Sequence, residues 1–429
     1  MIGLGTAPAA AKPNSKFNVV VLNDSSVAKG GATGLAILSA QMLQARGHKT
    51  TFISGDRGDD GALAACGIEP KPMGGALLLD SNLFSATKRG LYNAPIRDQI
   101  SQHIAQNDTP DTVYHLHGWS RILSPSVFDA LKPVARRTFI HAHDFFLGCP
   151  NGAFYDFQKH KVCTRQPLSM GCLATACDRR AYHHKIWRSL RSKALKSHFD
   201  TSLPWAGVLA LHPKMHEPLQ RSGIPGGLIK TLRNPARPFL KQRIKAEDNR
   251  SFCFIGRLVD GKGIDLLCQA ARIAKVPLRV IGEGEIQESL SKAYPEFEFT
   301  GWVDHHKISR HLGDVRALVM PSSTPEPFGL VVAEAVISGL PVILFRQTLL
   351  ADDVETMGLG FVPKAQNPES LAETLREVDT LARPQLRAMS ERGFDGKMSF
   401  ALSPDAWVNA LCHHYKAAIS DAKADLCLC

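Results

Sequence analysis

The chain has 429 residues, of which 44% are hydrophobic and 21% charged, and its formal net charge is +11. This is the composition of a globular protein long enough for two or three domains. No apolar run approaches the roughly 18 residues that span a bilayer. The positive charge predicts acidic partners, either phosphorylated compounds or an anionic membrane. Nucleic acid is not expected, because no basic motif with interleaved aromatic residues or zinc-finger spacing is present.

The N-terminal half alternates between apolar strands and amphipathic helices. Residues 1–16 lack an apolar signal core, so we expect a disordered leader and a cytoplasmic protein. A strand is predicted over residues 17–23 and, after a glycine-containing loop, a helix over residues 33–46. Further strands are predicted at residues 51–53, 113–117 and 138–144. This alternation indicates a doubly wound α/β domain over residues 17–236.

A second α/β domain is predicted after a proline-rich linker at residues 232–238. Strands and helices alternate again from Ser251, which gives a domain over residues 237–402. A terminal helix is expected at residues 404–418, within a C-terminal segment of residues 403–429. The predicted fold class is therefore α/β, with two Rossmann-like domains.

Two cations follow the first strand of this second domain. Arg257 and Lys262 stand five residues apart in a turn rich in glycine, before a predicted helix at residues 264–274. A guanidinium fork and an ammonium group suit the two charges of a diphosphate. The same residues taken alone also fit an ordinary solvated turn.

Two carboxylates, Glu326 and Glu334, lie eight residues apart between two apolar strands. A helix is predicted to begin near Leu330, and the free N–H groups of its first turn suit a phosphate. Carboxylates on either side of such a site are good acceptors for sugar hydroxyls. The alternative is that one is an exposed helix residue and the other a loop carboxylate near a helix N-terminus.

Both segments resemble those of glycosyltransferase family 4, the retaining nucleotide-sugar transferases of GT-B fold. The resemblance implies two doubly wound domains that face a central cleft, with the C-terminal helix crossing back onto the first domain. It implies that Glu326 contacts the transferred sugar and Glu334 the ribose, and that Arg257 and Lys262 bind the pyrophosphate. Further donor contacts are implied at Gly31, Gly256, Gly282, Val303, Phe328, Gly329 and Leu330, with Val303 at the nucleobase.

His143 precedes Asp144 at the end of a predicted strand and matches a family position whose histidine reaches the donor sugar. A histidine at a strand end can equally be structural. His141 lies two residues earlier, so both side chains share one face. No Asp-x-Asp pair occurs in the chain, which argues against the metal-dependent GT-A class. We therefore expect no cofactor for catalysis.

Four cysteines gather in one insert, residues 148–180, namely Cys149, Cys163, Cys172 and Cys177. A cytosolic chain does not usually keep such cysteines as disulfides. Four thiolates can hold a structural zinc ion in tetrahedral geometry, although no Cys-x2-Cys pair is present. Unconnected buried thiols are the alternative. A similar insert in some bacterial exopolysaccharide transferases of the family narrows the resemblance to surface-polysaccharide enzymes.

A basic segment follows the insert. Residues 179–198 contain seven cations and no acidic residue. Ile186, Trp187 and Leu190 recur at helical spacing, so the segment predicts an amphipathic helix that binds an anionic membrane surface at the inner face of the cell membrane. The alternative is a helix packed on its own domain. The cations are Arg179, Arg180, Lys185, Arg188, Arg191, Lys193 and Lys196.

The expected function is retaining transfer of a hexose from a nucleoside diphosphate sugar to a saccharide or polyprenyl-linked acceptor in surface-polysaccharide biosynthesis. Two alternatives remain at this point. One is a nucleotide-sugar enzyme without transfer, such as an epimerase. The other is a catalytically silent nucleotide-sugar-binding scaffold at the membrane. The sequence does not identify the nucleobase, the sugar or the linkage.

Overall fold

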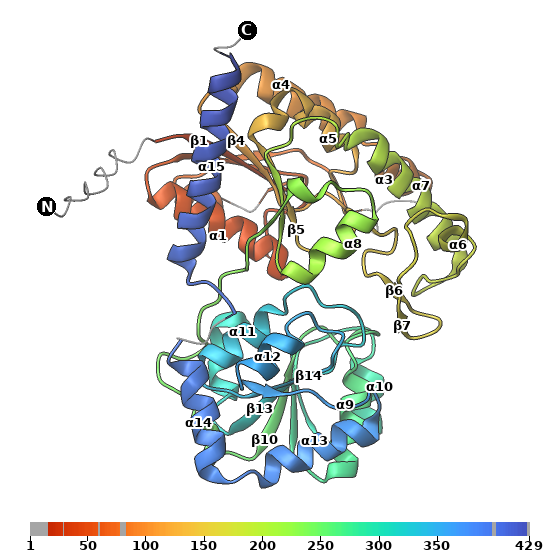
Figure 1. Cartoon of the computed structure of the whole chain (residues 1–429), viewed down its shortest axis with the longest axis vertical. Helices are drawn as coiled ribbons and strands as arrows, with labels where there is room; N and C mark the ends of the chain where they lie inside the picture. Colours follow the sequence, from red (N-terminus) through yellow and green to blue (C-terminus); the bar gives the residue numbers. More distant parts are fainter. Residues whose placement is uncertain (1–15, 29, 59–60, 78–82, 397–399, 427–429) are drawn as a thin grey trace, which may run out of the picture.

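Two parallel sheets, one in each half of the chain, organise the molecule (Figure 1). The structure is a computed structural model that describes residues 16–426 except 29, 59–60, 78–82 and 397–399. The predicted leader, apart from Lys16, therefore lies outside the described residues. The expected α/β class with two Rossmann-like domains is confirmed. Within the described residues, no helix is both long and apolar enough to cross a membrane.

The N-terminal sheet has seven parallel strands in the order β3-β2-β1-β4-β5-β8-β9. Its central strands β4 and β5 are buried at every position, as strands covered by helices on both faces must be. The strands are β1 (Asn18–Asn23), β2 (Lys49–Ser54), β3 (Glu69–Pro72), β4 (Thr112–Leu116), β5 (Thr138–Ala142), β8 (Gly207–Ala210) and β9 (Ile229–Thr231).

Helices and short turns cover this sheet, and the first of them starts two residues earlier than predicted. They are α1 (Gly31–Ala45), α2 (Ala62–Ala65), α3 (Leu83–Leu91), α4 (Ala94–Asn107), α5 (Ser126–Leu131), η2 (Lys132–Arg137), α7 (Tyr182–His198), η3 (Pro213–Met215), α8 (His216–Arg221) and η4 (Gly226–Leu228). The cysteine-bearing insert adds the hairpin β6 (Tyr155–Asp156) and β7 (Lys161–Val162), followed by α6 (Met170–Leu173).

The C-terminal sheet has six parallel strands in the order β12-β11-β10-β13-β14-β15. The strands are β10 (Ser251–Ile255), β11 (Leu278–Ile281), β12 (Glu298–Gly301), β13 (Val315–Met320), β14 (Val342–Leu344) and β15 (Gly360–Phe361). The helices are η5 (Ala246–Asp248), α9 (Ile264–Ala274), α10 (Gln287–Ala293), η6 (His305–His311), α11 (Leu330–Ile337), α12 (Ala351–Thr356), α13 (Pro368–Thr380) and α14 (Arg383–Phe394).

Strand order reverses between β1 and β4 in the first sheet and between β10 and β13 in the second. In open parallel sheets, ligands bind outside the carboxyl ends of the strands at such a reversal. The loops after β10 and β13 contain the two predicted donor-binding motifs. The topology therefore places both motifs at one end of the C-terminal sheet.

The last helix, α15 (Pro404–Leu426), leaves the C-terminal half and packs along the N-terminal domain (Figure 1). It extends eight residues beyond the predicted end at residue 418. Trp407 and Tyr415 of this helix are fully buried, and complete burial of such a side chain contributes about 2–3 kcal/mol. A second contact between the domains joins Asp353 of α12 to His212 at 2.9 Å and Arg233 at 3.0 Å.

Candidate functional site

Two loops of the C-terminal domain meet at the carboxyl ends of β10 and β13. One spans residues 256–263 and the other residues 321–329. Gly263 has a φ of 70°, and a Cβ at this position would lie 1.9 Å from the carbonyl oxygen of Pro321. Only glycine permits so close an approach. It brings the predicted phosphate-binding turn against the loop that carries Glu326.

An ion pair joins these loops, because Nζ of Lys262 contacts Oε2 of Glu326. The two side chains are 24% and 23% exposed. The sequence predicted Lys262 at a diphosphate and Glu326 at a sugar, and the structure places the two groups in direct contact. The ammonium group has three N–H donors, so it can also bind an incoming anion beside the carboxylate.

Arg257 lies in the same turn and its side chain is exposed. Its guanidinium group has no hydrogen bond or ion pair within the described part of the chain. Desolvation by the surrounding protein, followed by the charge of Arg121, lowers its pKa, and Arg179 adds to this effect. Sequence reasoning missed Arg121 and assigned Arg179 to a membrane surface. The crowding of three guanidinium groups makes this part of the cleft favourable for a polyanion.

Arg121 belongs to the loop after β4, and a buried carboxylate fixes that loop. The side chain of Asp24, directly after β1, accepts hydrogen bonds from the backbone N–H groups of residues 121–123 at 2.8–2.9 Å. Burial raises the pKa of Asp24 although these bonds act in the opposite sense. An aspartate at the end of the first strand was the sequence signal that could have indicated this support.

Two helix N-termini face each other across the domains. A Cβ added to Gly31, the first residue of α1, would lie 2.7 Å from Cδ1 of Leu330, the first residue of α11. Neither helix has a side chain that caps its first turn. The unpaired N–H groups of these turns are therefore available to an anion. The structure thus brings together Gly31, Gly329 and Leu330, which the sequence assigned to donor binding.

Glu334 lies one turn into α11 and is paired with a histidine that sequence reasoning missed. Oε1 of Glu334 is 2.8 Å from Nε2 of His305. This hydrogen bond raises the pKa of His305 above its ordinary value. The carboxylate predicted to hold ribose hydroxyls is therefore already engaged, by a side chain that is itself 62% exposed.

Three further residues that the sequence assigned to binding of the sugar donor differ in exposure and in backbone conformation. Gly282 has a φ of 138°, and a Cβ there would lie 1.9 Å from the carbonyl oxygen of Gly256. Val303 is partly buried and stands two residues before His305. Phe328 is 2% exposed, so its ring belongs to the core and only its backbone faces the loop.

His143 ends a stack of imidazole rings at the carboxyl ends of β4 and β5. Its ring lies 4.2 Å from that of His141 at an angle of 3°, so the predicted shared face is correct. Nε2 of His143 is 2.9 Å from Nδ1 of His117. Burial lowers the pKa of His143 to about 3. Burial and the charge of His143 together lower the pKa of His115 to about 3. These rings are therefore neutral at physiological pH.

Three of these histidines also have ring nitrogens within 4.8 Å of one another, namely His115, His117 and His141. A metal would need in-plane lone pairs that converge on one point. The rings of His115 and His141 are instead stacked, at an interplanar angle of 15°, and Nδ1 of His115 is 2.6 Å from the hydroxyl of Tyr415. The cluster therefore fits a packed imidazole stack better than a metal site.

Asp144 follows His143 at the end of β5 and is influenced by the charges of Arg121, Arg191 and Asp24. Its Oδ1 accepts a hydrogen bond from the backbone N–H of Phe146 at 2.8 Å. Desolvation raises the pKa of Asp144 to about 6, although that bond and the charge of Arg121 favour the ionised form. A carboxyl group with a pKa near the working pH can hold or release a proton.

The four cysteines of the insert line a single cavity together with Lys185 of α7.

The helix predicted in the basic segment is present as α7. Lys185 and Arg191 are 1% and 8% exposed, and Nε of Arg188 is 3.3 Å from the buried carboxylate of Asp178.

The outward face of α7 carries apolar side chains beside its exposed lysines, since Ile186 and Leu190 are 49% and 54% exposed. Lys185 and Arg191 are therefore not available to a membrane surface, whereas Lys193 and Lys196 remain exposed. Polar partners inside the domain, such as the carbonyl oxygen of Ser120 for Arg191, attract cations inward. Helical spacing alone does not reveal such partners.

Sequence comparisons relate the chain to known glycosyltransferases. Residues 237–394 match the family described as Glycosyl transferases group 1. The chain is 25% identical over 343 residues to an uncharacterised 42.6 kDa protein in the cps region of Klebsiella pneumoniae, covering 74% of this chain and 81% of that protein. It is 30% identical over 172 residues to the lipopolysaccharide core biosynthesis glycosyltransferase LpsE of Rhizobium meliloti, covering 37% and 48% of the two chains.

A solved structure of HepE from Anabaena, in complex with UDP and glucose, is similar in fold. It superposes with a TM-score of 0.64 at 14% identity and covers 94% of this chain and 100% of HepE. At that identity the likeness shows the fold alone. The chain thus has the GT-B fold, and residues 237–394 of its C-terminal domain match the glycosyl transferases group 1 family.

Proposed function

We propose that the protein transfers a hexose from a nucleoside diphosphate sugar to a saccharide acceptor, with retention of configuration, as a family 4 glycosyltransferase. The observation that carries this proposal is the contact of Lys262 with Glu326 beside the unpaired guanidinium of Arg257. Two cations can bind the diphosphate of a sugar donor, and a carboxylate can bind the hydroxyl groups of its sugar. The intervening helix N-terminus supplies N–H groups to the phosphate between them.

Donor binding exchanges one partner of Lys262 for another. A phosphate oxygen takes the ammonium group, and the Glu326 carboxylate turns to accept hydrogen bonds from the hexose hydroxyls. Arg257 binds the same diphosphate. As the bond from the anomeric carbon to the diphosphate oxygen lengthens, both cations stabilise the negative charge that develops on the leaving group.

Retention follows if the acceptor hydroxyl attacks from the face that the diphosphate leaves. Glu326 is held beside Lys262, so we assign it to the sugar hydroxyls and not to nucleophilic attack. Neutral His143 holds the donor sugar by a hydrogen bond. The acceptor's proton passes to the departing diphosphate, which completes the balance of the transfer.

At the other end of the donor, Glu334 binds the ribose. Its present partner, His305, is exposed and can swing away. The backbone near Val303 and Gly282 then lies beside the nucleobase. No metal or other cofactor takes part in this proposed mechanism.

We assign the acceptor to surface polysaccharide biosynthesis. The similarity to proteins named for a cps region and for lipopolysaccharide core biosynthesis supports this assignment. Intermediates of such polymers are lipid-linked, so a polyprenyl-linked saccharide is the acceptor we propose. Neither an epimerase nor a silent scaffold accounts for these relatives.

The membrane contact that such an acceptor requires is proposed to be the apolar stripe of α6 and α7, formed by Met170, Tyr182, Ile186 and Leu190. Met170 is 82% exposed and the others 44–54%. The exposed Lys193 continues the same helix face. An apolar stripe beside lysines suits the headgroup region of an anionic bilayer on the cytoplasmic side.

Donor class and retention are tested together. A thermal-shift screen with UDP, GDP and ADP and their sugars should identify one nucleotide that stabilises the protein. Transfer from that donor to a saccharide acceptor, with the anomeric configuration of the product read by NMR, should show retention. Donor conversion that does not need acceptor and yields an isomeric sugar nucleotide would favour an epimerase, and binding without any conversion a scaffold.

The membrane stripe is tested with vesicles. The Ile186→Asp, Leu190→Asp double variant should lose sedimentation with phosphatidylglycerol vesicles but keep transfer to a soluble acceptor. Ile273→Asp is the matched control, since Ile273 is 41% exposed on the C-terminal domain. Equal sedimentation of the parent and the double variant would contradict the assignment.

A further inference from the structure

The insert after β5 brings four cysteines from separate turns to one place. Cys149, Cys172 and Cys177 are 5–7% exposed, and Cys163 is partly exposed. All four line a cavity of about 10 Å³, which is about the space that one water molecule occupies. A void of this size surrounded by sulfur suits a single ion.

Each sulfur has a polar neighbour, and three of them accept hydrogen bonds from side-chain nitrogens. Nζ of Lys185 is 3.3 Å from Sγ of Cys172. Asn151 donates to Cys177 at 3.5 Å, and Arg165 to Cys163 at 3.7 Å. Donors around sulfur are typical of the shell that orients and stabilises metal-bound thiolates.

Lys185 supplies a second, independent observation, because its side chain is buried without a carboxylate. It is 1% exposed, and within the described residues its ammonium group has no acidic partner. A buried charge without a counter-charge is costly. Neutral thiols do not provide that counter-charge, whereas thiolates bound to a metal do.

We propose that Cys149, Cys163, Cys172 and Cys177 bind one zinc ion as four thiolates, with Lys185 as the positive charge beside it. The four thiol protons are released to solvent as the metal enters, and the resulting site carries a net charge of minus two. Lys185 offsets part of this charge. The sulfurs are more widely spaced here than in a filled site, where ligands 2.3 Å from zinc lie about 3.8 Å apart. Metal binding therefore draws the four side chains inward.

The insert contacts the C-terminal domain, which indicates a structural role for this ion. A Cβ built on Gly261 would lie 3.4 Å from the ring of Phe157, and Arg179 approaches Glu285 at 3.9 Å. Gly261 lies in the turn between Arg257 and Lys262. Zinc therefore braces the insert against the proposed diphosphate site, an inference that rests on the proposed function, whereas metal binding itself does not.

The first test measures metal in the intact protein. Chains purified from zinc-supplemented cells should contain about one zinc ion each by elemental analysis. Cobalt substitution should give the visible absorption bands of a tetrahedral thiolate site. Cys177→Ser should lose the metal and these bands, whereas Cys66→Ser should retain both, because Cys66 is exposed and lies outside the insert. Wild-type protein that neither contains zinc nor takes up cobalt would overturn the proposal.

The second test concerns Lys185 and keeps all four ligands. Lys185→Met should weaken zinc binding by roughly 10- to 100-fold in competition with a chromophoric chelator, the usual range for residues that support metal ligands. Lys196→Met is the matched control, since Lys196 is exposed on the same helix. Equal zinc affinities of the parent and Lys185→Met would show that Lys185 does not support the metal site. Zinc content is unaffected if the donor assignment fails, so the two proposals can fail separately.

Discussion

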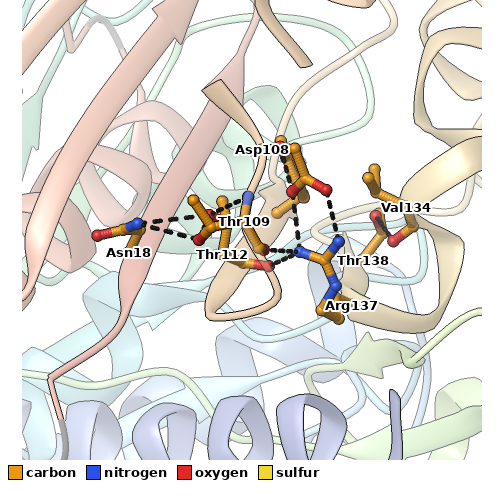
Figure 2. A network of polar contacts seen from close by, with 8 residues as sticks. Asn18, Asp108, Thr109, Thr112, Val134, Arg137 and Thr138 are labelled. Atoms are coloured by element: carbon orange, nitrogen blue, oxygen red, sulfur yellow. Dashed lines mark hydrogen bonds and ion pairs between the residues drawn. The ribbon is translucent and has the colours of Figure 1, made fainter. Parts of the chain in front are cut away.

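The amino end of the N-terminal sheet and the carboxyl ends of the two sheets treat polar groups in opposite ways. At the amino ends of β1, β4 and β5, Figure 2 shows a network of hydrogen bonds that includes an ion pair between Arg137 and Asp108. Arg137 binds both carboxylate oxygens of Asp108, at 2.9 and 2.7 Å, and the carbonyl oxygen of Thr109 at 2.8 Å. Asn18 and Thr112 complete it through side-chain hydrogen bonds.

At the carboxyl ends of the two sheets, by contrast, several polar groups lack partners among the described residues. Within the described part of the chain Arg257 is unpaired, the first turns of α1 and α11 have no side-chain cap, and the buried Nε2 of His117 has no hydrogen bond. A satisfied network lowers the free energy of the folded chain by itself. Polar groups without partners lower the free energy of the folded chain only when a bound ligand supplies those partners. The amino edge is therefore expected to govern folding stability and the carboxyl edge binding.

The largest expected effect is at the amino edge. Arg137→Ala should reduce the free energy of unfolding by about 3 kcal/mol, because it removes both hydrogen bonds of the ion pair with Asp108 and two further bonds to carbonyl oxygens. Urea denaturation measures this loss. Arg136→Ala is a neighbouring control, since Arg136 is exposed and pairs with Asp425 at the surface, and it should change stability by less than about 0.5 kcal/mol. Similar losses in both variants would contradict the comparison.

The carboxyl edge should show the reverse behaviour. Arg257→Ala and Lys262→Ala should each weaken binding of the nucleoside diphosphate by roughly 1.5–3 kcal/mol, the range for charge-assisted hydrogen bonds, with little loss of stability. Glu334→Ala should impair nucleoside binding and Glu326→Ala mainly turnover. Calorimetric titration and transfer assays distinguish these outcomes.

Lys292→Ala serves as the control for these variants, because Lys292 is 74% exposed in α10 and pairs with Glu288 of the same helix. It should bind the nucleotide as the parent does. Unchanged affinity and turnover in all four site variants would refute the proposed donor site.

The imidazole stack should make stability depend on pH. Burial lowers the pKa of His115 in the folded protein to about 3, whereas the unfolded chain has about 6.5. Below pH 6.5 protons bind the unfolded chain first, so stability is complete above this pH and is lost between about 6.5 and 3. Each such histidine changes the free energy of unfolding by up to about 1.4 kcal/mol per pH unit.

Chemical denaturation at a series of pH values measures this slope. His141→Leu removes one depressed histidine and should make the slope shallower, while the neutral-pH stability changes little. An identical slope in the variant would show that the stack does not govern acid sensitivity.

The smallest effect is expected at His305. Its hydrogen bond to Glu334 raises the pKa of His305, so protonation at low pH strengthens the contact that the ribose must displace. Nucleotide affinity should therefore increase as pH rises through neutrality. His305→Gln should abolish that dependence while affinity changes by less than about 1 kcal/mol, as is usual for exposed pairs. Affinity measured from pH 6 to 8.5 in both proteins tests this.

Local patterns were sufficient to predict most of the fold. Apolar strands followed by glycine turns identified the loops after β10 and β13, because strand period and turn chemistry are local properties. The contact of Lys262 with Glu326 was not predictable, since it joins loops 64 residues apart in sequence. The same holds for Arg121, which reaches the site through Asp24.

The orientation of α7 shows a different kind of limit. A helix-period pattern predicts which residues share a face, but not which face is inward. Ile186 and Leu190 share a face as predicted, yet that face is outward because Lys185 and Arg191 find buried partners. The convergence of four cysteines likewise depends on how irregular turns fold back, which spacing does not reveal.

Helix α15 has a consequence for the order in which the protein matures. The N-terminal sheet is complete once β9 has been synthesised, at residue 231, but its outer apolar face is covered by Trp407 and Tyr415. The covering helix follows the whole C-terminal domain, and a backbone bridge from Pro235 to Leu402 sets the outgoing and returning segments side by side. During translation the apolar surface of the first domain therefore stays exposed until the second domain has been synthesised. The N-terminal domain, although synthesised first, completes its core last.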